Sequence, residues 1–263
     1  MISFFRLRKK KIGLVLGGGA VRGIAHIGVL QALHDNNIPI HSIAGTSAGS
    51  IVGGLFAAGL QPNKIAALLK SLSWSDFAKI QLPKQGLASS EPIENLIINN
   101  VGDLTFSDLK IPLTVMATDI LSGESVLLNE PTMKIGKAIR ASASFPGVFS
   151  PTKLNDRHLC DGGASANLPI NVARKMGANF IIACDVIPKI NLDSIPDNMI
   201  SLTSRSLDIL LNSITNQKNE KANILLNPVT KDINSFQLNK ADELIELGKN
   251  AMLEQIENLK GLY

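Results

Sequence analysis

A serine flanked by small residues is the strongest chemical signal in this sequence of 263 residues. Gly45-Thr46-Ser47-Ala48-Gly49 lies between an apolar stretch that predicts a strand and a stretch with helical periodicity. In that setting a G-x-S-x-G segment makes a tight turn that exposes the serine hydroxyl. The helix that follows would direct backbone N–H groups and a positive dipole end toward developing negative charge. The pattern favours Ser47 as a nucleophile supported by Gly45 and Gly49, and a plain glycine-rich turn is the alternative.

A second glycine-rich segment, Gly17-Gly18-Gly19, also follows a predicted strand and opens a helix. Backbone N–H groups at such a position bind anions, so either an oxyanion or a nucleotide phosphate would suit them. The glycines follow the pattern G-x-G-x-x-x-G, and the second strand ends in Ala44-Gly45 rather than in an acid that could hold a ribose hydroxyl. Both details favour an oxyanion site. Because parallel strands adjacent in sequence usually lie close in space, we expect the two loops to meet.

A nucleophilic serine needs a base, and the four histidines fit that role poorly. In α/β-hydrolases the acid and then the histidine follow the serine, and only His158 follows Ser47 here. For His26, His34 and His41 we expect packing or solvent exposure. A structural role is also the better interpretation of His158.

Asp161 stands directly before Gly162-Gly163, and an aspartate before two glycines indicates by itself only a turn. Three motifs in order, GGGAVRG at 17–23, GTSAG at 45–49 and DGG at 161–163, resemble those of the patatin-like phospholipases. The segments AHIGVL at 25–30 and ASASFPG at 141–147 also look like family segments. The resemblance covers residues 11–186 well and the last quarter of the chain weakly.

The resemblance implies a serine–aspartate dyad, which accounts for the lack of a suitable histidine. It implies Ser47 as nucleophile, Asp161 as general base, Gly17, Gly18 and Gly19 as oxyanion hole, and Arg22, Gly45, Gly49 and Gly162 in support. The implied reaction is hydrolysis of carboxylic esters of lipids, whether phospholipid, lysophospholipid or acylglycerol, without a metal or an organic cofactor. The glycine loop has one more residue before its last glycine than the shortest family form. The resemblance therefore does not decide which N–H groups of the loop face the oxyanion.

Two other functions remain as alternatives: a nucleotide-binding protein that uses the glycine loop, and a catalytically silent lipid-binding or regulatory module on the same fold. Arg22 suits either a substrate phosphate or a structural ion pair. Cys160 stands next to Asp161, and we expect a small buried residue there rather than a nucleophile.

The elements that must position these residues alternate between strand and helix. Strands are expected at 11–16, 41–44 and 179–186, with a strand pair at 111–120 and 124–128, a short strand at 158–161 and another at 224–226. Helices are expected after each glycine turn, at 133–143, around Leu207 to Ile214, and near the C-terminus with Ile245, Met252, Ile256 and Leu259 on its core face. This alternation predicts a three-layer α/β fold with a mostly parallel central sheet and helices on both faces. We expect one domain over 11–263, preceded by a basic tail over 1–10.

Composition excludes several classes of function. Aromatic residues make up 4% of the chain, which argues against a stacking platform for nucleic acid. Two cysteines make neither a disulfide framework nor a zinc site, so a reducing, cytoplasmic compartment is expected. Without the five basic residues at its start the chain would lose its net charge of +4 and become nearly neutral. That basic cluster would contact an anionic membrane surface or remain a solvated tail, and its members are Arg6, Arg8, Lys9, Lys10 and Lys11.

Overall fold

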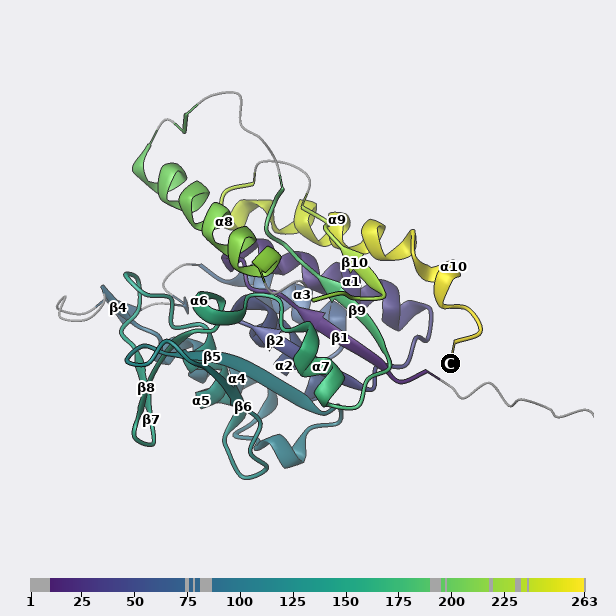
Figure 1. Cartoon of the computed structure of the whole chain (residues 1–263), viewed down its shortest axis with the longest axis horizontal. Coiled ribbons are helices and arrows are strands. Elements are labelled where there is room, and N and C mark those ends of the chain that lie inside the picture. The colour runs from purple at the N-terminus through teal and green to yellow at the C-terminus, as the bar shows by residue number, and fades with distance from the viewer. Residues whose placement is uncertain are drawn as a thin grey trace, which may run out of the picture.

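The computed structural model describes residues 10–73, 76–77, 79–80, 87–189, 195–196, 198–217, 220–229, 233–235 and 237–262 (Figure 1). Its central sheet has the strand order β10-β9-β1-β2-β5-β8-β7, and β6 pairs with β5 beside this path. The strands are β1 (Ile12–Leu16), β2 (Ser42–Thr46), β5 (Leu113–Asp119), β6 (Ser125–Leu128), β7 (Thr152–Leu154), β8 (Arg157–Asp161), β9 (Phe180–Cys184) and β10 (Ile224–Leu226). The run from β10 to β5 is parallel, whereas β6, β7 and β8 pair antiparallel. A separate antiparallel pair joins β3 (Lys79–Ile80) to β4 (Ala88–Ser89).

Both faces of this sheet are covered, which confirms the three-layer prediction. Side chains along a strand point alternately to opposite faces. Leu14 of β1 and Ile182 of β9 belong to the larger apolar cluster, whereas Val15 and Ile181, each one residue away, belong to a second cluster. Strands buried on both faces are expected to be almost continuously apolar, as the sequence IGLVL of β1 is.

The helices divide between these two faces. They are α1 (Ala25–Asp35), α2 (Ala48–Ala57), α3 (Pro62–Ser71), α4 (Glu91–Val101), α5 (Ile135–Ser142), α6 (Gly163–Ala166), α7 (Ile170–Lys175), α8 (Met199–Gln217), α9 (Ala241–Leu253) and α10 (Ile256–Leu259). Side chains of α1, α2, α4 and α5 enter the larger cluster, and those of α7 enter the second one. Short 3₁₀ turns complete the fold at η1 (Ala20–Ile24), η3 (Phe106–Asp108) and η4 (Leu238–Lys240).

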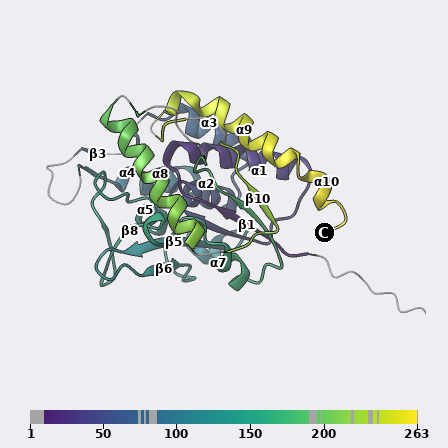
Figure 2. The same ribbon diagram turned by 45° about the horizontal axis from the view of Figure 1, so that its top comes forward.

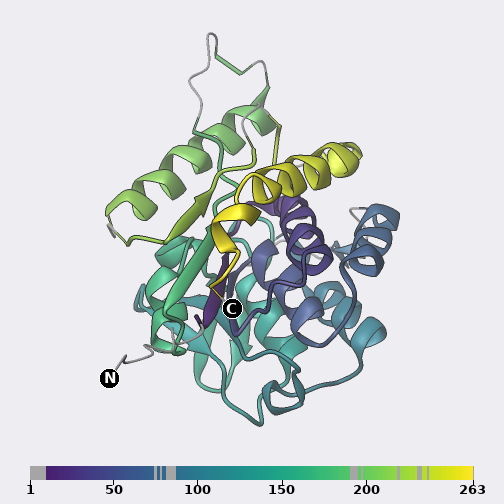
Figure 3. The same ribbon diagram turned by 90° about the vertical axis from the view of Figure 1, so that its right-hand side faces the viewer.

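The C-terminal helix α9 lies along α1 near the start of the chain (Figure 3). The two helices touch through a pair of glycines. A Cβ at Gly28 would lie 1.9 Å from the carbonyl oxygen of Ile245, and one at Gly248 would lie 1.8 Å from that of Ala25. Neither position has room for a side chain, so these glycines allow the helices to pack backbone against backbone.

The sequence predictions differ from the structure in three places. β7 was not expected; β8, for which no direction was predicted, runs antiparallel to β5. The single predicted C-terminal helix is divided into α9 and α10. On α9, Met252 is fully buried as expected, but Leu244 is fully buried as well and the expected core residue Ile245 is only half-buried. The close contact at Gly248 sets the rotation of α9, which a search for apolar spacing does not detect.

Candidate active site

Two strands that end on the same edge of β5 bring Ser47 and Asp161 together. β2 runs parallel to β5 and pairs Thr46 with Met116, while β8 runs antiparallel and pairs Asp161 with Ala117. β6 pairs with these same residues of β5 and therefore lies on its other edge. The carboxyl ends of β2 and β8 thus meet head to head. Ser47 follows β2 directly and Asp161 is the last residue of β8, so the sheet itself sets their proximity.

Ser47 has the strained backbone of a sharp strand-to-helix turn. Its φ of 50° and ψ of −122° place a non-glycine residue in a region that costs about 1–3 kcal/mol. Its N–H donates to Oγ of Ser142 at 2.8 Å, and its carbonyl oxygen accepts from Oγ of Ser50 at 2.6 Å. These bonds hold the turn, and its side chain lines the cavity described below.

Asp161 is a buried carboxylic acid with 5% of its surface exposed. Burial raises its pKa to about 6, because the charged form is poorly solvated there. Hydrogen bonds from the Ser47 hydroxyl and from the Gly163 N–H (2.7 Å to Oδ1) oppose that rise in pKa. An acid with a pKa near 6 is a better proton acceptor at neutral pH than an ordinary aspartate. The pair can therefore move a proton from the serine to the carboxylate.

The glycine loop lies against Ser47, as the predicted meeting of the two loops requires. A Cβ at Gly18 would lie 3.1 Å from Cβ of Ser47. The loop also supplies fewer donors than expected, because the N–H of Gly17 already donates to the carbonyl of Cys184 at 3.0 Å. Gly17 is therefore no oxyanion donor, and this corrects the expectation from the sequence. The N–H groups of Gly18 and Gly19 have no acceptor among the described residues, and both glycines line the cavity.

His26, which is buried, contacts the first residue of this loop. Its Nε2 lies 2.7 Å from the carbonyl oxygen of Gly17, and burial lowers the pKa of the imidazole to about 4. A neutral ring donates from Nε2 to that carbonyl. Of the packing or solvent exposure expected for His26, the structure shows packing, and the ring also fixes the direction of the first peptide of the glycine loop.

The glycines expected to support the site occupy positions where a side chain has no room. A Cβ at Gly49 would lie 2.1 Å from the carbonyl oxygen of Leu16, so α2 begins directly against the end of β1. At Gly162 it would lie 2.4 Å from the carbonyl oxygen of Met116, where β8 leaves β5. At Gly45 it would lie 2.9 Å from the carbonyl oxygen of Gly49, within the turn itself.

Arg22 makes a buried ion pair, which decides between the two roles left open for it. Its guanidinium binds the carboxylate of Asp208 on α8 through two contacts, one of them from Nη1 to Oδ2 at 2.8 Å. Its Nε also lies 3.5 Å from the carbonyl oxygen of Gly19. Arg22 is 2% exposed and Asp208 is 4% exposed. The ion pair ties α8 to the glycine loop.

We expect Asp208→Ala to lower the free energy of unfolding by about 3–5 kcal/mol, because it leaves a buried guanidinium without its counter-ion. The double variant Arg22→Met/Asp208→Leu should be much closer to the parent, since it removes both charges. Urea unfolding of the three proteins measures this. Glu257→Ala is the control, because it breaks the exposed pair with Lys260 and should cost under about 1 kcal/mol. Equal losses in the control and in Asp208→Ala would contradict the prediction.

Ser47 and Asp161 adjoin a cavity of about 520 Å³, a volume within the range of small-molecule sites. Ser47, Asp161, Gly18 and Gly19 line one part of it. The remaining walls are largely apolar and come from α2, α4, the 145–149 segment and α8. Such a cavity suits an aliphatic chain beside a reactive carbonyl.

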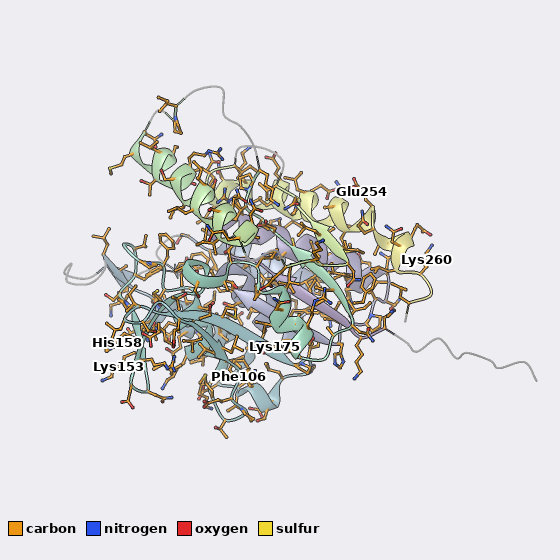
Figure 4. The ribbon with its side chains drawn as sticks, in the orientation of Figure 1. Phe106, Lys153, His158, Lys175, Glu254 and Lys260 are labelled. Atoms are coloured by element: carbon orange, nitrogen blue, oxygen red, sulfur yellow. The ribbon has the colours of Figure 1, made fainter. Side chains whose placement is uncertain are left out.

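The other candidate nucleophile and base lie away from this cavity. His158 is on the β7–β8 hairpin opposite Lys153, toward the edge of the molecule (Figure 4). His34 is exposed and His41 is half-buried. Cys160 is buried on β8, where burial first and the neighbouring Asp161 charge second raise its thiol pKa to about 11. A thiol with that pKa stays protonated at neutral pH.

Sequence reasoning missed three residues of the site. Asn167 is buried and lines the cavity; its Nδ2 lies 3.4 Å from the carbonyl oxygen of Gly18, and its Oδ1 has no partner among the described residues. Oγ of Ser142 accepts a hydrogen bond from the Ser47 N–H, and the carboxylate of Asp208 forms the ion pair with Arg22. Ser142 stands in the ASASFPG segment at 141–147 and Asn167 follows the DGG motif at 161–163, but nothing in their types marks them. Asp208 is 186 residues from its partner and left no local signal.

The described part of the chain holds neither a metal-binding cluster nor a helix that could span a membrane. It contains no group of three or more His, Cys, Asp or Glu side chains arranged to hold a metal ion. None of its helices combines the length and apolar character that crossing a bilayer requires.

A family model for the patatin-like phospholipases matches residues 14–174, which include Ser47 and Asp161. The chain belongs to the patatin-like phospholipase family. This family is one of lipid acyl hydrolases, and the resemblance stated from the sequence motifs is thereby confirmed.

Curated relatives of this patatin-like chain include NTE family proteins of Mycobacterium bovis and Mycobacterium tuberculosis, 38% identical over 176 residues. That match covers 66% of this chain and 48% of each relative. Lysophospholipase NTE1 of Saccharomyces cerevisiae is 36% identical over 195 residues, covering 70% of this chain and 11% of the yeast protein. The chain thus spans about half the length of the mycobacterial relatives and a small part of the yeast one.

Solved structures of low sequence identity share the fold of this patatin-like chain. VipD of Legionella pneumophila matches with a TM-score of 0.60 and 15% identity, over 95% of this chain and 67% of VipD. ExoU of Pseudomonas aeruginosa, solved with SpcU, matches with a TM-score of 0.51 and 17% identity, over 95% of this chain and 53% of ExoU.

Proposed function

We propose that the protein hydrolyses carboxylic esters of lipids through a dyad of Ser47 and Asp161. One observation carries the proposal: the Ser47 hydroxyl donates a hydrogen bond to a buried carboxylate of raised pKa, beside a glycine loop and under an apolar cavity. Family membership supports the same reaction class.

In the proposed reaction, Asp161 accepts the proton of Ser47 while Oγ attacks the ester carbonyl. The N–H groups of Gly18 and Gly19 stabilise the oxyanion, and the loss of one such donor typically costs about 2.7–4 kcal/mol. The tetrahedral intermediate then collapses, and the leaving alcohol takes the proton from Asp161. Water attacks the acyl-enzyme and gives a proton to Asp161, which returns it to Ser47 as the fatty acid leaves.

The substrate class follows from the shape and chemistry of the cavity. An apolar cavity beside Ser47 favours a long acyl chain over a short polar acid. The yeast relative is named a lysophospholipase. We propose that this chain acts on the same general class of lipid esters. Phospholipid, lysophospholipid and acylglycerol esters are therefore the substrates to test.

The nucleotide-binding alternative loses support from the surroundings of the glycine loop. Gly18 lies against Ser47, and the space beyond it is bounded mainly by apolar side chains, which do not suit a pyrophosphate and a ribose. A silent lipid-binding module would not need a serine hydrogen-bonded to a desolvated carboxylate. We therefore favour the active hydrolase over both.

A fluorophosphonate probe tests the proposal, because it reacts with an activated serine. We expect one label on each chain, at Ser47, together with turnover of p-nitrophenyl esters. If the protein shows no labelling and no turnover, the silent module is favoured. Thermal stabilisation by NAD or ATP without labelling would favour nucleotide binding.

We also propose that residues 11–263 form one catalytic domain, which the packing of α9 on α1 supports. We further propose that the basic cluster at residues 6–11, the basic head, contacts an anionic membrane at its cytoplasmic face. Arg6, Arg8 and Lys9 lie outside the described residues, and Lys10 and Lys11 precede β1.

A further inference from the structure

The outward face of α8 carries no charge among its described side chains. Nine of the side chains described on α8 are exposed and fall on one side of the helix, and four of them are large and apolar: Met199 (80% exposed), Leu202 (48%), Ile209 (55%) and Leu210 (58%). The other exposed residues of this face are Thr203, Ser206, Ser213, Asn216 and Gln217. Surface helices normally present charged residues to solvent. On α9, for comparison, the exposed residues include Asp242 and Glu246.

The two charged residues of α8 lie off this face. Asp208 is buried against Arg22, and Arg205 is half-buried on the flank. Lys189 lies beside Arg205 and Ile209 along a shallow groove at that flank. The face is therefore uncharged and combines large apolar side chains with small polar ones, and along one border lie Arg205 and Lys189, of which Lys189 pairs with Asp185 at 3.8 Å. This distribution matches a phospholipid surface, where apolar chains lie beneath a layer of phosphates.

The outward face is also continuous with the mouth of the cavity above Ser47. Leu207, Leu211 and Ile214 on the inner side of α8 line that cavity. Leu210 lines it too and is 58% exposed, so it lies at the rim. Pro146 and Ala164, which also line the cavity, are exposed as well. A lipid held at the outward face would have its acyl chain next to the opening.

We propose that this outer face of α8 docks on a phospholipid bilayer, so that an acyl chain passes Leu210 into the cavity without crossing water. The inference rests on the proposed function. In Figures 1 and 2, α8 runs from the upper left toward the middle of the molecule, whereas the marked C-terminus and the start of β1 lie to the right. Lys10 and Lys11 precede β1, so docking through α8 differs from contact through the basic head.

Sedimentation with phosphatidylcholine vesicles tests the docking surface. Leu202→Glu and Ile209→Glu each place a charge on the outer face, and neither residue lines the cavity. We expect each to weaken vesicle binding at least about tenfold, since every methylene withdrawn from lipid costs roughly fourfold in partition. Hydrolysis of vesicle lipid should fall in parallel, while hydrolysis of a short soluble ester stays at the parent rate. Leu253→Glu on the exposed side of α9 is the matched control and should behave as the parent does.

Salt and oligomeric state complete the test. Binding of the parent to these neutral vesicles should change little with added salt, whereas binding through the basic head would be screened. Unchanged vesicle binding by both Glu variants, or no binding by the parent, would overturn the docking proposal. A parent dimer that dissociates in the variants, with vesicle binding intact, would make the face a contact between copies of this chain. If the parent itself does not hydrolyse the soluble ester, the proposed function is overturned instead.

Discussion

Ser47→Ala is expected to lower kcat for ester hydrolysis by about 10⁴–10⁶-fold, as removal of the nucleophile does in other serine hydrolases. Labelling by the fluorophosphonate probe should disappear with it. The fold should persist, because the bonds that hold the turn use the backbone of Ser47 rather than its hydroxyl. Kinetics with a p-nitrophenyl ester and circular dichroism of the same preparation measure both expectations.

Two variants serve as controls for Ser47→Ala. Ser71→Ala removes an exposed hydroxyl at the end of α3 and should leave activity unchanged. His158→Gln should spare most activity, since that ring lies on the β7–β8 hairpin and does not line the cavity. A folded but inactive His158 variant would restore the triad. Turnover by Ser47→Ala at the parent rate would remove Ser47 as the nucleophile.

Asp161→Asn is expected to abolish hydrolysis almost as fully as the serine variant, because it removes the proton acceptor while keeping the size of the side chain. The double variant should be little worse than either single one, since members of one catalytic unit are not additive. In the parent, kcat/KM should rise with pH through about 6, the pKa of the carboxyl that must be ionised to act as base. A rate that is flat from pH 5 to 8, measured where the fold is intact, would contradict Asp161 as that base.

The same substitution should stabilise the fold at neutral pH. The folded-state pKa of Asp161 is about 6 and the ordinary value is 3.8, so the folded state binds the proton more tightly than the unfolded state. The free energy of unfolding of the parent therefore falls as pH rises from about 4 to above 6. Asn does not ionise, so Asp161→Asn should be more stable than the parent at about pH 8, by on the order of 2–3 kcal/mol, and should lose that advantage near pH 4.

Urea unfolding at both pH values measures this difference. Asp119→Asn is the matched control, because Asp119 is also a buried aspartate at the end of a strand, near Arg157 and bound to the Leu121 N–H. It should show neither the gain in stability nor the loss of activity. A less stable Asp161→Asn protein at about pH 8 would mean that the carboxylate stabilises the fold rather than costing it stability.

Local features of the site could be predicted from the sequence. The strand–turn–helix around Ser47 and the glycine loop depend on small residues at fixed positions within a few residues of each other. Apolar runs such as IGLVL predicted strands buried on both faces, and the alternation with helices predicted three layers. These predictions succeeded because backbone sterics and side-chain periodicity act over short distances along the chain. Asp161, by contrast, was marked only by resemblance to a family, because by itself an aspartate before two glycines indicates a turn.

Contacts between distant segments were decided by the tertiary structure. The antiparallel pairing of β8 on the edge of β5 next to β2 places Asp161 beside Ser47, and no pattern within β8 encodes that register. The rise in the pKa of Asp161 follows from burial by surrounding elements, and its sequence neighbour Gly163 opposes that rise. Pairing of Arg22 with Asp208, and of the Gly17 N–H with Cys184, likewise depends on which strands and helices become neighbours. Such partners are selected by the packing of the whole sheet, because hydrogen bonds and ion pairs form between whatever groups the fold brings within reach.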